Sequence, residues 1–113
     1  MPDQIKIQKA EGTWVVRAGG AVLGESQAAL EVTEGRATAA IYFPRTDVAM
    51  AFLDRSDSRT ICPRKGAASY YNLVTKSTTI NDACWSYEDP KPLAEELRDY
   101  LSFFPDRVTV EQI

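Results

Sequence analysis

The chain has 113 residues, of which 44% are hydrophobic, and this composition suits one folded domain with its own core. Its formal charge of −3 disfavours binding to nucleic acid, and no apolar run approaches the ~18 residues of a membrane span. Because the chain has no histidine, it lacks His-dependent catalysis, and its two cysteines cannot supply the four ligands of a structural zinc site. We expect no metal and no cofactor.

The cellular compartment and the number of domains can also be predicted from the sequence. Met1 to Gln4 contain neither the basic nor the apolar region of a signal peptide. We therefore expect a cytoplasmic protein in which Cys62 and Cys84 are free thiols. No linker, repeat or low-complexity segment divides the chain, so residues 1–113 are expected to form a single domain. The sequence leaves open whether this domain is a monomer or a homodimer.

In the first half of the chain, alternating, aromatic and β-branched residues predict short strands. These strands are expected at residues 4–8, 13–17, 21–23, 30–33 and 39–43. Gly19-Gly20 and Glu34-Gly35-Arg36 supply turns between them. Pro44 ends the last strand because proline cannot donate a hydrogen bond to a sheet. Thr46 or Asp47 would then cap a short helix over residues 48–53.

The second half continues this pattern with one further helix. Turns are expected at residues 54–58, 63–66 and 81–82, with a hairpin tip at 76–77. Strand segments are expected at residues 60–62, 69–75, 78–80, 83–87 and 107–111. Asp89-Pro90 is typical of a helix start, and the apolar face of that helix would be formed by Leu93, Leu97, Tyr100 and Leu101.

About eight or nine short strands and two short helices predict a mainly β protein. We expect a compact antiparallel sheet of barrel-like or sandwich-like form. A parallel β–α–β architecture is not expected, because the helices do not alternate with the strands.

Cationic residues gather in the turn Cys62-Pro63-Arg64-Lys65-Gly66. Gly66 would let the backbone approach a ligand, while Arg64 and Lys65 supply charge for a phosphate or carboxylate. The alternative is a solvated basic turn in which glycine satisfies a positive φ. Cys62 is either a reactive thiolate favoured by these cations or a buried residue at a strand end, and Cys84 is expected in the core.

Three other places carry candidate site residues. Arg45 follows Pro44 and either binds an anion or pairs with an acid such as Asp47, Glu88 or Asp89. Trp85 and Tyr87 alternate with Ser86, so they face one side of a strand. They would either line a pocket with Tyr70 or supply area to the core.

Four segments of the chain carry a family resemblance. They are Tyr42-Phe43-Pro44-Arg45-Thr46-Asp47-Val48, Cys62-Pro63-Arg64-Lys65-Gly66 with Ala68 and Tyr70, Trp85-Ser86-Tyr87-Glu88-Asp89-Pro90, and Phe104-Pro105-Asp106-Arg107-Val108. Over roughly residues 15–110, the chain resembles the bacterial and fungal family of small domains called domain of unknown function 427. Pro105 stands where many members carry a Trp or Asn.

The resemblance implies a compact, single-domain β-rich fold and leaves the activity open. Some catalogues attach a nucleotidyltransferase label to the family. Nucleotidyl transfer generally needs two carboxylates holding Mg²⁺ near a phosphate-binding Gly-rich turn. This sequence has no Gly-Ser turn followed by Asp-x-Asp and no Walker-type Gly-x-x-x-x-Gly-Lys.

Three functions remain open from the sequence. The first is a module that binds a small anionic molecule in a pocket lined by basic and aromatic residues. Its candidate ligand-binding residues are Arg45, Cys62, Arg64, Lys65, Gly66, Tyr70, Trp85, Tyr87 and Glu88. The second is an enzyme acting on a small anionic substrate, with Lys65 or Cys62 as the reactive group and Glu88 or Asp89 as its carboxylate partner. The third is a structural or homo-oligomeric interaction domain.

Overall fold

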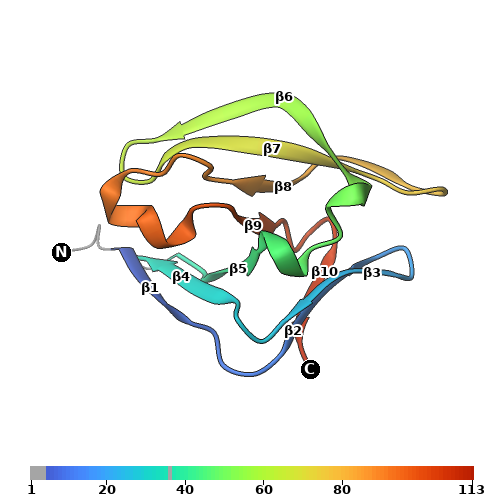
Figure 1. Ribbon diagram of the computed structural model, residues 1–113, viewed down its shortest axis with the longest axis horizontal. Helices are drawn as coiled ribbons and strands as arrows, with labels where there is room; N and C mark the ends of the chain where they lie inside the picture. Colours follow the sequence, from blue (N-terminus) through green and yellow to red (C-terminus); the bar gives the residue numbers. More distant parts are fainter. Residues whose placement is uncertain (1–4, 36) are drawn as a thin grey trace.

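The computed structural model describes residues 5–35 and 37–113, which form two antiparallel sheets (Figure 1). The larger sheet has seven strands in the order β1-β4-β5-β9-β8-β7-β6, and the smaller has three in the order β10-β2-β3. The strands are β1 Ile5–Lys9, β2 Trp14–Ala18, β3 Ala21–Ser26, β4 Leu30–Glu34, β5 Ala40–Pro44, β6 Leu53–Cys62, β7 Gly66–Val74, β8 Thr79–Ser86, β9 Tyr100–Phe103 and β10 Thr109–Gln112.

The mainly β, antiparallel prediction is confirmed. Within the described residues β1 and β6 each pair with one neighbour, so the larger sheet is open and does not close into a barrel. Gln4 in the first predicted strand and Arg36 in a predicted turn lie outside the described residues. None of the described helical segments is long and apolar enough to cross a membrane.

The two sheets share one hydrophobic core. Val16 and Leu23 of the smaller sheet pack with Phe43, Leu101 and other buried side chains of the larger sheet. Cys84 also belongs to this core and is fully buried, as the sequence predicts. Burial raises the pKa of the Cys84 thiol to about 12 although the charge of Arg45 opposes the shift, so this thiol stays protonated at neutral pH.

A second cluster covers the other face of the larger sheet. Neighbouring residues along a strand point to opposite faces, so Phe43 enters the first core and Tyr42 the second. Tyr42 and Tyr87 pack there with Ala94 and Leu97. These last two residues belong to η3 (Pro92–Leu97), a 3₁₀ segment seen in Figure 1 in front of the strands, between β7 and β4.

Both predicted helices are shorter than expected. The first is replaced by two 3₁₀ turns, η1 (Arg45–Asp47) and η2 (Met50–Phe52). The second is limited to η3, and Asp99 then adopts a left-handed φ of 62°. Beyond it the chain becomes β9, where Leu101 pairs with Phe43 on one side and Ser86 on the other. The apolar spacing of Leu97 and Leu101 therefore reflects a turn followed by a central strand.

Two predicted turns lie inside strands. The turn expected at residues 54–58 falls within β6, where the register with β7 shifts between Arg55 and Arg59. The turn expected at residues 81–82 falls within β8, where Asp82 has a φ of 52° and its backbone N–H donates to Asn72 Oδ1 at 2.8 Å. In both places polar turn-forming residues mark an irregularity in pairing, so each strand is longer than the sequence indicates.

Candidate functional site

Two arginines and a tyrosine converge on one carboxylate, and we call this set the arginine–tyrosine cluster: Arg45, Arg55, Tyr71 and Glu88. Arg55 Nη2 donates to Glu88 Oε1 at 2.7 Å, and Arg45 Nη2 donates to Glu88 Oε2 at 3.1 Å. The Tyr71 hydroxyl donates to Glu88 Oε2 and accepts from Arg55 at 3.3 Å and from Arg45 at 3.4 Å. Both Glu88 oxygens are therefore held by cationic donors.

The fold brings these residues together from four segments. Arg45 begins η1 directly after β5, Arg55 lies in β6 opposite Tyr71 in β7, and Glu88 follows β8. The Arg45 and Arg55 guanidinium carbons lie 5.7 and 5.4 Å from the centre of the Tyr71 ring. Each arginine thus combines an ion pair with a cation–π contact, which restricts its orientation.

The electrostatics of the cluster favour an ionised Glu88. Burial acts to raise the Glu88 pKa, but the hydrogen bonds from Tyr71 and Arg55 and the charges of both arginines outweigh it, so the pKa is lowered. Burial and the hydrogen bond to Glu88 raise the pKa of Tyr71, whose hydroxyl therefore keeps its proton and acts as a donor. Arg45 Nε is buried and has no hydrogen-bond partner among the described residues.

A second set of charges, the lysine–glutamate cluster, joins the β6–β7 turn to the end of β4. Its members are Arg64, Lys65, Glu34 and Tyr87. Lys65 Nζ donates to Glu34 Oε2, and Arg64 Nη2 donates to Glu34 Oε1 at 3.2 Å. The Lys65 ammonium also lies 5.2 Å from the centre of the Tyr87 ring, and its side chain is only 9% exposed. Lys65 is therefore a buried, paired cation, and its partner is Glu34 rather than Glu88 or Asp89.

The turn that carries Lys65 is held by the segment after β8. Lys91 donates its backbone N–H to the Lys65 carbonyl at 2.9 Å and its Nζ to the Pro63 carbonyl at 2.8 Å. Gly66 has a φ of 113°, and a Cβ there would lie 3.3 Å from the Asp89 carbonyl oxygen. Cys62 is half-buried and packs against the second core cluster. Gly66 therefore permits a close approach between the β6–β7 turn and residues 89–91.

The predicted aromatic wall is partly assembled. Tyr70 stacks on Phe104 with ring centres 6.3 Å apart, and Phe104 contacts Trp85 at 4.6 Å. Trp85 also donates its Nε1 to the Tyr42 hydroxyl at 3.1 Å. Tyr87 lies apart from these stacked rings and packs with Ala94 and Leu97 of η3.

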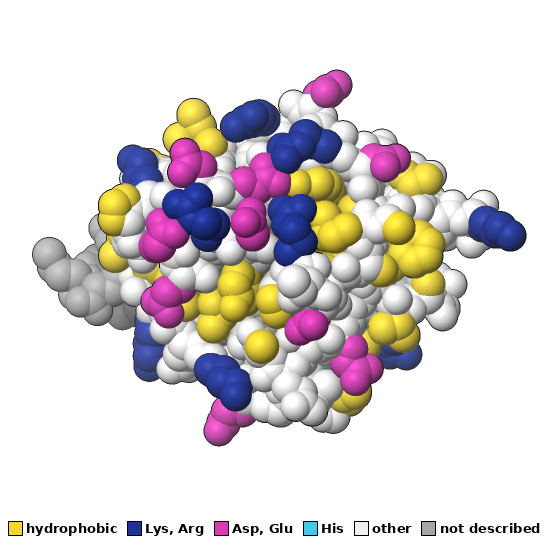
Figure 2. Space-filling view, in the orientation of Figure 1, with side chains coloured by type: hydrophobic (Ala, Val, Ile, Leu, Met, Phe, Trp, Pro, Cys, Tyr) yellow, Lys and Arg dark blue, Asp and Glu magenta, His cyan; other side chains and the backbone are white. Residues whose placement is uncertain are grey.

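The sequence-predicted site residues are thus divided between groups. Arg45 and Glu88 meet around Tyr71, which belongs to the core between the sheets, whereas Lys65 lies over Tyr87 in the other core cluster. In the view of the molecule in Figure 2, Lys and Arg side chains are interspersed with Asp and Glu side chains over the upper part of the surface. Within the described residues, no group of three or more His, Cys, Asp or Glu side chains could hold a metal ion.

The sequence does not single out three important partners, Arg55, Glu34 and Tyr71. Its local pattern predicts turns at Arg55 and Glu34 and an ordinary strand position at Tyr71. Their partners lie far away in sequence: 33 positions separate Arg55 from Glu88, and 31 separate Glu34 from Lys65. The local clustering of arginines near Arg55 was the only signal available in the sequence.

Residues 6–113 match the protein family described as Domain of unknown function (DUF427). The chain belongs to this family. The resemblance found from the four sequence motifs is therefore confirmed over nearly the whole chain. A search of curated proteins gave no match. In this DUF427 domain the motif residues Arg45 and Glu88 occupy the arginine–tyrosine cluster, and Lys65 and Gly66 form the turn of the lysine–glutamate cluster.

Proposed function

We propose that this DUF427 domain binds a small molecule bearing a carboxylate or phosphate group at the arginine–tyrosine cluster. The observation that carries the proposal is the convergence of two guanidinium groups and the Tyr71 hydroxyl on the single carboxylate of Glu88. Such convergent, partly fixed donors are the usual means by which proteins recognise a planar oxyanion. Glu88 therefore occupies the position that an anionic ligand would take.

The charge balance supports exchange with a ligand. Within the direct contacts, two positive charges meet one negative charge, although Asp99 also acts electrostatically on Arg45. The Arg55 side chain is 54% exposed and that of Glu88 is 26% exposed, so an anion from solvent has access to both. Because each guanidinium carries five donors, a ligand can bind Arg55 beside Glu88 or displace the Glu88 carboxylate.

Calorimetric titration with inorganic phosphate and with benzoate tests the proposal. We expect weak binding to the wild type, because Glu88 competes for the same donors. Glu88→Gln removes the competing charge but keeps the side-chain shape, so affinity should rise about tenfold. Arg55→Gln should lower the affinity by a similar factor.

The matched control is Arg17→Gln, which removes an arginine of a different surface ion pair, with Glu111. This variant should bind phosphate and benzoate as the wild type does. Equal affinities in Arg55→Gln, Glu88→Gln and the wild type would place anion binding elsewhere or nowhere on the domain.

A further inference from the structure

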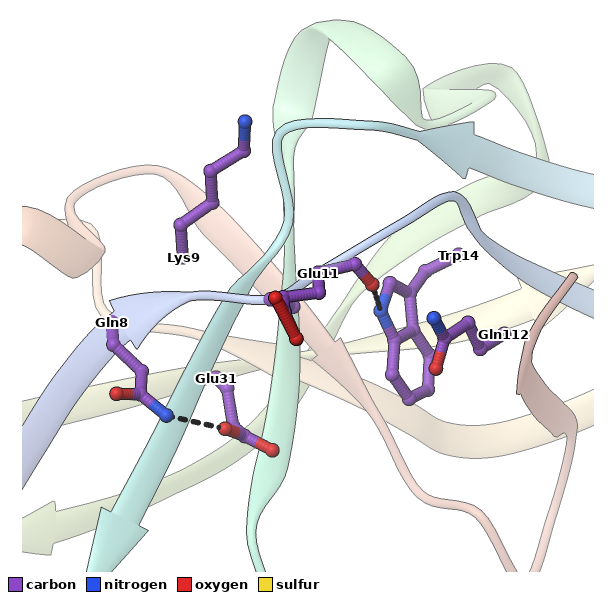
Figure 3. Close-up of a pocket in the computed structure, with 7 residues that line it drawn as sticks. Gln8, Lys9, Glu11, Trp14, Glu31 and Gln112 are labelled. Atoms are coloured by element: carbon purple, nitrogen blue, oxygen red, sulfur yellow. Dashed lines mark hydrogen bonds between the residues drawn. The ribbon is translucent and has the colours of Figure 1, made fainter.

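A second region, whose lining includes no member of the arginine–tyrosine cluster, carries more acidic than basic side chains. A hollow of about 470 Å³ lies where the end of β1 passes β4 and β2. Figure 3 shows the residues that line it. Its polar and aromatic lining comes from Gln8, Lys9, Glu11, Trp14, Glu31 and Gln112. The side chains of Glu11, Glu31 and Trp14 border this space, whereas the Lys9 amino group points away from both carboxylates (Figure 3).

The orientation of the lining groups is fixed by hydrogen bonds. Trp14 Nε1 donates to the Glu11 carbonyl at 3.0 Å, which sets the plane of the indole ring. Gln8 Nε2 donates to Glu31 Oε1 at 2.8 Å, which orients that carboxylate and leaves its second oxygen available (Figure 3). Among residues 5–35 and 37–113, no cation forms an ion pair with Glu11 or Glu31. Two anionic charges therefore border the hollow without a cationic partner in the described part of the chain.

Trp14 and Glu31 also border a second hollow of about 420 Å³ that is mainly apolar. Its walls include Ile41, Trp85, Phe103 and Val110, from both sheets. A volume of this size is within the range of small-molecule pockets. The two hollows are adjacent in that both are lined by Trp14 and Glu31. A molecule that contacts these two residues would have its charged end near the first hollow and its apolar body near the second.

We propose that this pair of hollows binds an organic cation, a protonated or quaternary amine attached to an apolar or aromatic body. The cationic group would lie between the Glu11 and Glu31 carboxylates and against the Trp14 ring. Aromatic faces and carboxylates both attract such cations, and a quaternary amine loses little hydration when it contacts an indole. The apolar body would contact Trp85, Ile41 and Phe103.

Tryptophan fluorescence tests the proposal directly, because Trp14 and Trp85 are the two tryptophans of the chain and both border the apolar hollow. The probe is benzyltrimethylammonium, compared with tetramethylammonium, which lacks the body, and benzyl alcohol, which lacks the charge. We expect a saturable change with benzyltrimethylammonium at a Kd on the order of 1 mM, and weaker binding of the other two probes. Rising salt should weaken the binding of benzyltrimethylammonium.

Conservative substitutions test whether the Glu11 and Glu31 carboxylates attract the cation. Glu31→Gln and Glu11→Gln should each weaken binding about tenfold, because each removes one carboxylate with little change in shape. Glu25→Gln is the matched control, an exposed acid on β3 outside both hollows, and should bind as the wild type does. Arg55→Gln should also leave this binding unchanged, which separates it from the proposed anion site.

Three results would overturn the proposal. One is the absence of any saturable signal with benzyltrimethylammonium. Another is equal affinity for benzyl alcohol, which would make the site merely apolar. The third is an affinity within about twofold of wild type when Glu11 and Glu31 are both replaced by glutamine, because the carboxylates would then contribute nothing.

Discussion

At the level of single residues, Glu88 accepts hydrogen bonds from more side chains than any other acid in the described part of the chain. Tyr71, Arg55 and Arg45 all donate to its two oxygens, and their combined effect lowers its pKa against the opposing effect of burial. An acid whose pKa is lower in the folded than in the unfolded protein stabilises the fold while it is ionised. Glu88 therefore contributes stability as well as occupying the proposed anion site.

This contribution gives a pH-dependent prediction. The stabilisation is fully present above the ordinary glutamate pKa of 4.5 and is lost as the pH falls from there through the lower pKa of the folded state. Glu88→Gln cannot lose it, so the free energy of unfolding of this variant should fall less steeply below pH 4.5 than that of the wild type. Urea unfolding at a series of pH values measures the difference.

The control for this experiment is Glu96→Gln, an exposed acid that forms no ion pair among the described residues. Its pH dependence should follow the wild type. Parallel curves for Glu88→Gln and the wild type would show that the contacts around Glu88 do not stabilise its charge.

Among the elements of the fold, the β6–β7 turn depends on glycine for two reasons. Gly66 combines a φ of 113° with a close approach to the Asp89 carbonyl and the Lys91 backbone nitrogen. An alanine Cβ would be strained by the backbone conformation and would also press on these atoms. The segment it would displace is the one that donates to the Lys65 and Pro63 carbonyls.

We expect Gly66→Ala to lower the free energy of unfolding by about 2–3 kcal/mol in urea denaturation. Gly20→Ala is the matched comparison, because Gly20 also has a positive φ of 83° but no atom within 4 Å of the added methyl group. It should lose only about 1 kcal/mol. An equal or larger loss at Gly20 would mean that the contact with residues 89–91 adds no constraint at Gly66.

At the scale of the whole molecule, the two sheets share one core, formed by Val16 and Leu23 on one side and Phe43 and Leu101 on the other. Neither sheet can bury these side chains alone, so the chain should unfold in one cooperative transition. One cooperative transition is what a single domain over residues 1–113 predicts.

The two tryptophans provide the measurement, because Trp14 lies in the smaller sheet and Trp85 in the larger. Trp14→Phe and Trp85→Phe each leave one fluorescent reporter. In each variant the fluorescence transition and the far-UV circular dichroism transition should have the same urea midpoint. A Trp14 signal that changes at lower urea than the circular dichroism would show that the smaller sheet unfolds separately.

Properties that depend on the local order of residues could be predicted from the sequence. Alternating apolar residues located the strands of the first half to within a few residues, and Pro44 and Gly19-Gly20 marked their ends correctly. The four motifs identified the family. The burial of Cys84 beside Trp85 also followed from local composition. These features depend on the period of a strand and on the preferences of individual residues, which act over a few positions.

The pairing of charged side chains and the formation of β9, the middle strand of the larger sheet, depended on tertiary contacts. The apolar spacing of Leu97, Tyr100 and Leu101 suits a helix, but pairing with β5 and β8 turns residues 100–103 into β9. Likewise the sequence predicts one pocket for Arg45 and Lys65, but Arg45 pairs with Glu88 in one cluster and Lys65 pairs with Glu34 in another. A cation is paired by whichever acid the strand register places beside it, and register is set by contacts between residues that are distant in the sequence.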